Sequence, residues 1–137
     1  MTMTALRTGS IVTPVKFTLD SGIPANLVRG YSDTEIRVGA RSLRGSCIVT
    51  AETVIEHWEP ESFAALLPAH LEPILALAPE LIVLGTGPRQ QFPSTEIRAL
   101  VAARGVGLEA MALGPACRTF NVLVQEERRV AAGLFLR

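Results

Sequence analysis

Apolar residues in the first part of the chain alternate with polar ones. Ile36 and Val38 are separated by one charged residue, and the alternation resumes a few residues later. A period of two is typical of a strand with one buried face. We therefore predict antiparallel strands here, joined by a type II′ turn at Gly39 and Ala40. A further strand is predicted over residues 52–58, which are rich in β-branched side chains.

The middle of the chain changes to the spacing of an amphipathic helix. Apolar residues recur three and four positions apart over residues 61–67 and again over residues 71–78. Pro68 should end the first of these helices. Pro73 falls in the first turn of the second, where proline is tolerated.

The second half alternates strands with helices. A continuous apolar run at residues 81–84 is typical of a strand buried on both faces. The elements predicted after it are a helix from Ser94 to about Arg104 with Gly105 as its C-terminal cap, a strand at 107–111, a helix at 118–127 and a strand at 130–136. Such an order requires crossover connections with helices on the faces of a sheet. The predicted fold class is α/β, a three-layer sandwich around a mixed central sheet with additional N-terminal antiparallel β structure.

The length and composition indicate one folded domain. The chain has 137 residues, so residues 1–137 form a single domain without a dividing linker. Residues 1–26 are rich in Thr, Ser, Gly and Pro and are predicted to form an N-terminal arm or edge segment. Hydrophobic residues make up 48% of the chain, and this share excludes a disordered protein.

Charge and hydropathy exclude several classes of partner. The 13 basic and 13 acidic residues give a net charge of zero, and aromatic residues are only 5% of the chain, so we expect no nucleic-acid partner. No apolar stretch approaches the ~20 residues that cross a bilayer, so we expect no membrane insertion. The N-terminus has no apolar segment typical of a signal peptide, and the expected location is cytoplasmic.

The metal-binding and nucleophilic side chains are few. Cys47 and Cys117 form no CxxC pair, and His57 and His70 are the only histidines. We therefore expect no metal, no cofactor and no catalytic residue. Cys117 would need a helix N-terminus and a nearby base to act as a nucleophile, so a small buried apolar residue is the favoured interpretation.

The first candidate binding segment is the glycine loop after the buried strand. Backbone amides of Gly85, Thr86 and Gly87 could hold an anion at the carboxyl end of that strand. The spacing matches neither a P-loop nor a dinucleotide-binding motif, although Glu109 lies near the position of a ribose-binding acid. The alternative, which the sequence favours, is a tight connection that needs small residues.

The second candidate segment is a polar cluster near the last helix. Arg118 could bind an anion with two hydrogen bonds, and Asn121 lies one helical turn later. Thr119 stands between them. Arg118 could equally pair with Glu109, and Asn121 could bind backbone groups of a neighbouring loop. Both interpretations stay open at this point.

Taken in order, several residues form a recognisable pattern over residues 30–137. They are Tyr31, Ile36, Val38, Gly39, Gly45, Ser46, Trp58, Leu84, Gly85, Thr86, Gly87, Glu109, Met111, Arg118, Thr119, Phe120, Asn121, Val122, Leu123, Glu127, Arg129, Ala131 and Ala132. This pattern resembles the family of domains of unknown function that includes the mitochondrial complex I assembly factor 3. The resemblance implies a three-layer sandwich with extra β structure and no established enzyme activity. Because the chain has no transit peptide pattern, we expect a bacterial, cytosolic relative. Phe120 stands where tyrosine is common in the family.

Two functions remain as hypotheses. The first is a non-enzymatic binding or assembly domain for a protein partner, with a link to complex I assembly implied by the resemblance. Its surface would lie around the 85–87 loop and the 118–121 segment. The second is a small-molecule or anion site at the same residues, with Arg118 holding the anion. The absence of a recognisable acid, base or nucleophile favours the first. A structural homo-oligomer is a third interpretation.

Overall fold

The central element of the fold is a mixed five-stranded sheet. The computed structural model describes residues 25–137, so only the last two residues of the predicted arm at 1–26 fall within it. The sheet has the order β5-β4-β8-β6-β7, and its strands are β4 (Cys47–Thr50), β5 (Val54–Ile55), β6 (Leu81–Thr86), β7 (Gly107–Met111) and β8 (Val130–Phe135). Strand β6 pairs with β7 and β8 in parallel, whereas β4 pairs with β8 and β5 antiparallel. The predicted mixed sheet is confirmed.

Two crossovers place helices on opposite faces of this sheet. The first runs from β6 through α2 (Thr95–Ala103) to β7, and the second runs from β7 through α3 (Leu113–Gln125) to β8 on the other side of β6. The first crossover moves along the sheet from β6 to β7, and the second moves back past β6 to β8. Because both crossovers are right-handed, their helices cover opposite faces of the sheet. Ser94 caps α2 as predicted, since its hydroxyl accepts the amide of Ile97 at 3.1 Å. Gly105 follows the helix with φ of +73°.

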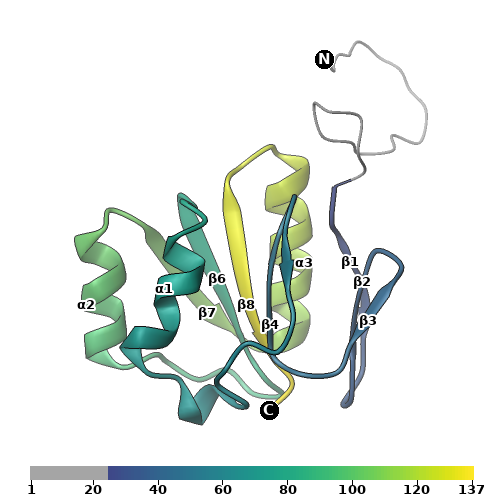
Figure 1. Ribbon diagram of the computed structural model, residues 1–137, viewed down its shortest axis with the longest axis horizontal. Helices are drawn as coiled ribbons and strands as arrows, with labels where there is room; N and C mark the ends of the chain where they lie inside the picture. The colour runs from purple at the N-terminus through teal and green to yellow at the C-terminus, as the bar shows by residue number, and fades with distance from the viewer. Residues whose placement is uncertain (1–24) are drawn as a thin grey trace.

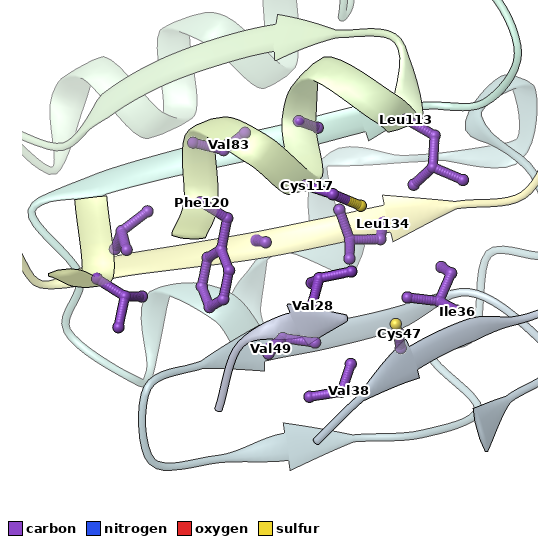
Figure 2. Close-up of a cluster of buried hydrophobic side chains, with 14 of the residues drawn as sticks. Val28, Ile36, Val38, Cys47, Val49, Val83, Leu113, Cys117, Phe120 and Leu134 are labelled. Carbon is purple, nitrogen blue, oxygen red and sulfur yellow. The ribbon is translucent and has the colours of Figure 1, made fainter. Parts of the chain in front are cut away.

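One outer layer combines α3 with a separate small sheet. Its strands are β1 (Val28–Tyr31), β2 (Ile36–Val38) and β3 (Arg41–Leu43), paired antiparallel in that order. Gly39 has φ of +58° while Ala40 has no positive φ, and this geometry agrees with the predicted type II′ turn. Figure 2 shows the side chains of β1, β2 and β4 meeting those of α3 and β8 in one apolar cluster. The predicted N-terminal antiparallel β structure is therefore confirmed.

The opposite layer contains α2 and a group of short helical turns. These are η1 (Phe63–Ala65), η2 (Pro68–Leu71) and α1 (Glu72–Leu75). Figure 1 shows α1 and α2 on the side of the sheet away from α3 and β1–β3. The ring of Trp58 packs against Phe135 of the central strand β8 with 5.0 Å between ring centroids. The three layers of the predicted sandwich are thus α1 with α2, the central sheet, and α3 with the small sheet.

Four predicted elements were wrong in extent, and one of them, the helix at 71–78, is only the four residues of α1. The strand at 52–58 is reduced to β5, because His57 adopts φ of +57° and turns the chain so that Trp58 enters the core. The helix at 61–67 is only the short turn η1. The helix predicted at 118–127 begins instead at Leu113. Pro115 lies in its first turn, where backbone amides form no hydrogen bonds within the helix, so a proline is tolerated there.

Candidate functional site

The loop after β6 uses its polar groups inside the molecule. The Thr86 side chain is fully buried. Its hydroxyl lies 2.6 Å from the carbonyl oxygen of Arg89 and accepts the amide of Gln91 at 3.1 Å. The Gln91 side-chain amide in turn donates to the Thr86 carbonyl at 3.2 Å. Thr86 therefore folds the loop back on itself and presents no group to a ligand.

The two glycines of this loop are required by close packing. A Cβ on Gly85 would lie 3.1 Å from the Cβ of Ala116 on α3, and Gly87 has φ of +95°. The carbonyl of Gly87 accepts the amide of Leu113, the first residue of α3, at 2.8 Å. These contacts agree with the alternative that the sequence favoured, a tight connection that needs small residues.

Asn121 fastens strand β1 to helix α3. Its side-chain amide donates to the Val28 carbonyl at 2.9 Å, and its side-chain oxygen accepts the Val28 amide at 2.9 Å. The neighbouring carbonyl of Leu27 points the other way and accepts the amide of Gly39, in the turn that follows β2. Asn121 thus occupies the free edge of β1 as a paired strand would. Of the two interpretations left open for Asn121, these contacts agree with the binding of backbone groups, here those of a strand.

Arg118 lies on the exposed side of α3 next to two exposed apolar side chains. Tyr31 is 48% exposed and Val122 is 50% exposed. The Tyr31 hydroxyl and one Arg118 guanidinium nitrogen both lie within 3.5 Å of where a Gly114 Cβ would be. Gly114, Arg118 and Val122 follow one another at intervals of four residues, so they share a helix face. We call Tyr31, Arg118 and Val122 the α3 strip.

The predicted pairing of Arg118 with Glu109 is not seen. In residues 25–137 none of the four ion pairs involves either residue. Glu109 is exposed on β7, an edge strand of the central sheet. Thr119 is half-buried, and its hydroxyl points to the sulfur of Met111 at 3.4 Å. The structure therefore joins the 85–87 loop to the start of α3 but leaves Arg118 outside that contact.

Both cysteines are buried in the apolar cluster around α3. Cys47 is fully buried on β4, and Cys117 is 4% exposed on α3. Burial raises the pKa of each thiol to about 12, because the thiolate would lose its hydration. A thiolate is the reactive form, so these residues have the properties of small apolar side chains. No cluster of ligands suited to a metal ion occurs among the described residues.

A surface cavity that the sequence did not indicate opens beyond the end of β8. Its volume is about 410 Å³, and its lining comes from three separate segments: Arg44, Gly45 and Ser46, then His57, Trp58, Glu59 and Glu61, then Leu136 and Arg137. No local pattern marks these residues, because the first two segments meet through the pairing of β4 with β5 and the third joins them through the pairing of β4 with β8.

Curated proteins and solved structures similar to this chain share its domain. A 13 kDa major membrane protein of Francisella tularensis is 38% identical over 61% of this chain and 69% of its own length. An NADH dehydrogenase [ubiquinone] 1 alpha subcomplex assembly factor 3 from Danio rerio is 29% identical over 79% of this chain. The match covers 63% of the assembly factor, so this chain spans less than two thirds of that relative.

The fold agrees with these relationships. A solution structure of a Xanthomonas campestris protein is 39% identical, with a TM-score of 0.76, and the match covers 89% of this chain and 92% of that one. Among the described residues, no helix has the length and apolar character needed to cross a membrane. A family model described as "Protein of unknown function (DUF498/DUF598)" matches residues 28–135. The chain therefore belongs to the DUF498/DUF598 family, a domain family that includes the assembly factors similar to this chain.

Proposed function

We propose that this chain is a non-enzymatic protein-binding domain of the assembly-factor type, and that the α3 strip contacts its partner. The observation that supports this function is the strip itself. Two large apolar side chains, each about half exposed, stand beside an arginine that has no ion pair in residues 25–137. Tyrosine and arginine are enriched among residues that contribute most to protein interfaces.

The charge of the strip selects the kind of partner. Arg118 is exposed and can form two parallel hydrogen bonds to one carboxylate. The flanking Tyr31 and Val122 supply apolar area that would exclude water from such a pair. The expected partner surface therefore carries an acidic residue beside an apolar patch.

The assembly role is inferred from the relatives. Several relatives are named as assembly factors of an NADH dehydrogenase. We infer that this chain assists assembly of a respiratory NADH dehydrogenase in its own organism. The test is deletion of the gene, followed by measurement of NADH oxidation by membranes and of the assembled complex on native gels. Normal amounts of complex in the deletion strain would contradict this role.

The α3 strip is tested by affinity capture from cell extract. We expect the wild-type chain to retain a partner that the Arg118→Ala, Val122→Ala double variant loses. Arg98→Ala is the matched control, because Arg98 is an exposed arginine on α2, on the other side of the sheet. A partner retained equally by all three chains would place the interface elsewhere. Catalytic turnover that disappears with folded Arg118→Ala would contradict a non-enzymatic role.

The alternative anion site at the 85–87 loop has no comparable support. Thr86 and the carbonyl of Gly87 already form internal hydrogen bonds, and a guanidinium at Arg118 lies on the exposed side of α3. Thermal melting with nucleotides and small carboxylates tests it directly. A ligand at 100 times its dissociation constant should stabilise the chain by ~2.7 kcal/mol.

We also propose a cytoplasmic location and no nucleic-acid partner. The zero net charge supports both, since no overall field attracts the chain to anionic lipid or nucleic acid. The Francisella relative is named a membrane protein, so cell fractionation is the decisive measurement. Recovery of the chain with membranes after a salt wash would contradict the cytoplasmic proposal. Sedimentation analysis of the purified chain tests whether the chain forms a homo-oligomer.

A further inference from the structure

The cavity beyond β8 shares no residue with the α3 strip and is built from fixed main chain. Ser46 is 5% exposed, and its hydroxyl donates to the carbonyl of Trp58 at 3.0 Å. The amide of Trp58 returns a hydrogen bond to the Ser46 carbonyl at 3.1 Å. The carbonyl of Arg137 accepts the amide of Phe63 at 2.9 Å. The three segments that line the cavity are therefore tied to one another and to the core.

The backbone of one segment that lines the cavity has an unusual conformation. His57 has φ of +57°, in the left-handed region that a side chain with a Cβ seldom adopts. Such a conformation costs about 1–3 kcal/mol and persists where its surroundings enforce it. Here the following residue, Trp58, is anchored in the core by its contact with Phe135 and by a hydrogen bond from its indole nitrogen to the His70 carbonyl at 3.1 Å. The strained turn lies within the cavity lining, between His57 and Glu59.

Charges of both signs line the cavity without neutralising one another. Arg44 and Arg137 are basic, and Glu59 and Glu61 are acidic. Within residues 25–137, no ion pair joins either arginine to a carboxylate, and the basic group nearest to Glu59 is His70 at 3.9 Å. A cavity with separated charges of opposite sign complements a ligand that also carries both signs.

We propose that this cavity binds a small zwitterion, a free amino acid or a short peptide. The carboxylate of the ligand pairs with Arg44 and Arg137, and its ammonium group pairs with Glu61, which has no ion pair within residues 25–137. A simple anion fits less well because the two glutamates would repel it. The volume of about 410 Å³ lies within the 300–1,000 Å³ range of ligand sites and accommodates a dipeptide.

The charge requirement is tested with the dipeptide alanyl-alanine and two blocked forms. Backbone amide spectra of the labelled chain are recorded while each peptide is added up to about 10 mM, a range that detects millimolar binding. We expect saturable shifts at Gly45, Ser46 and Leu136 with alanyl-alanine. N-acetylation, which removes the ammonium, and C-terminal amidation, which removes the carboxylate, should each weaken binding at least about tenfold. No saturable shift, or equal binding of a blocked form, would overturn the proposal.

Variants then separate the cavity from the rest of the surface. Arg44→Gln and Glu61→Gln each remove one charge and should weaken alanyl-alanine binding at least about tenfold. Arg98→Gln and Glu96→Gln are the matched controls, because both residues are exposed on α2 and should leave binding unchanged. Unchanged spectra away from the cavity establish that each variant is folded. Full binding by folded Arg44→Gln together with folded Glu61→Gln would also overturn the proposal.

Discussion

The side-chain amide of Asn121 forms hydrogen bonds with both the amide and the carbonyl of Val28, each at 2.9 Å. The two residues are 93 positions apart in the chain. This contact attaches the small sheet to α3 and satisfies an edge of β1 that would otherwise be open to another strand.

Asn121→Ala should therefore destabilise the fold. The substitution leaves the amide and carbonyl of Val28 without their partner, and we expect a loss of about 2 kcal/mol in the free energy of unfolding. Urea denaturation measures this change. Gln125→Ala is the control, since Gln125 is exposed on the same helix. A change below about 0.5 kcal/mol for Asn121→Ala would show that water replaces the side chain at no cost.

Gly133→Ala should destabilise the central strand. An added Cβ at Gly133 would lie 2.9 Å from the Trp58 ring and 3.0 Å from the Leu84 side chain, and both of these residues are buried. Overpacking of this kind costs about 1–3 kcal/mol. Gly45→Ala is the matched control, because no atom lies within 4 Å of its added Cβ. Thermal melting of the two variants compares them directly, and equal melting temperatures would contradict the packing argument.

Acid should destabilise the fold partly through Glu80. The amide of Arg129 donates to the Glu80 carboxylate at 3.0 Å, and this hydrogen bond, with the Arg128 guanidinium at 3.2 Å, lowers the pKa of Glu80 below its ordinary 4.5. Since the folded-state pKa is the lower one, this stabilisation is fully present above pH 4.5 and is lost as pH falls through the folded-state pKa. Melting temperatures measured from pH 6 downward should fall less steeply for Glu80→Gln than for wild type. Identical slopes would exclude this contribution, and Glu126→Gln serves as the control.

The two thiols should resist chemical modification in the folded chain. Burial raises the pKa of Cys47 and Cys117 to about 12, so almost no thiolate forms near pH 8. An aromatic disulfide reagent should label neither cysteine in buffer and both in denaturant. Rapid labelling of native Cys117 would mean that the first turns of α3 open readily. It would also support Cys117 as a nucleophile.

Elements with strong local signals could be predicted from the sequence. The apolar run in β6 and the capping serine of α2 depend on neighbouring residues, and both were confirmed. The start of α3 was predicted at residue 118 instead of 113, although Pro115 is compatible with the first turn of a helix. Nothing local could show which chain segment Asn121 would contact. The same holds for the cavity, because its charged residues come from three segments that meet only when β4 pairs with both β5 and β8.

The position of β8 in the sheet also has a consequence for biosynthesis. Within residues 25–137 this strand follows all the others along the chain, yet it lies between β4 and β6 and contributes residues to both apolar clusters. Until the ribosome has synthesised β8, the nascent chain contains β4 and β6 but lacks the strand that joins them in the sheet. Both apolar faces then stay exposed, and such exposure favours aggregation and chaperone binding. Completion of the sheet must therefore follow translation of β8, and a truncation before Val130 should yield an insoluble chain.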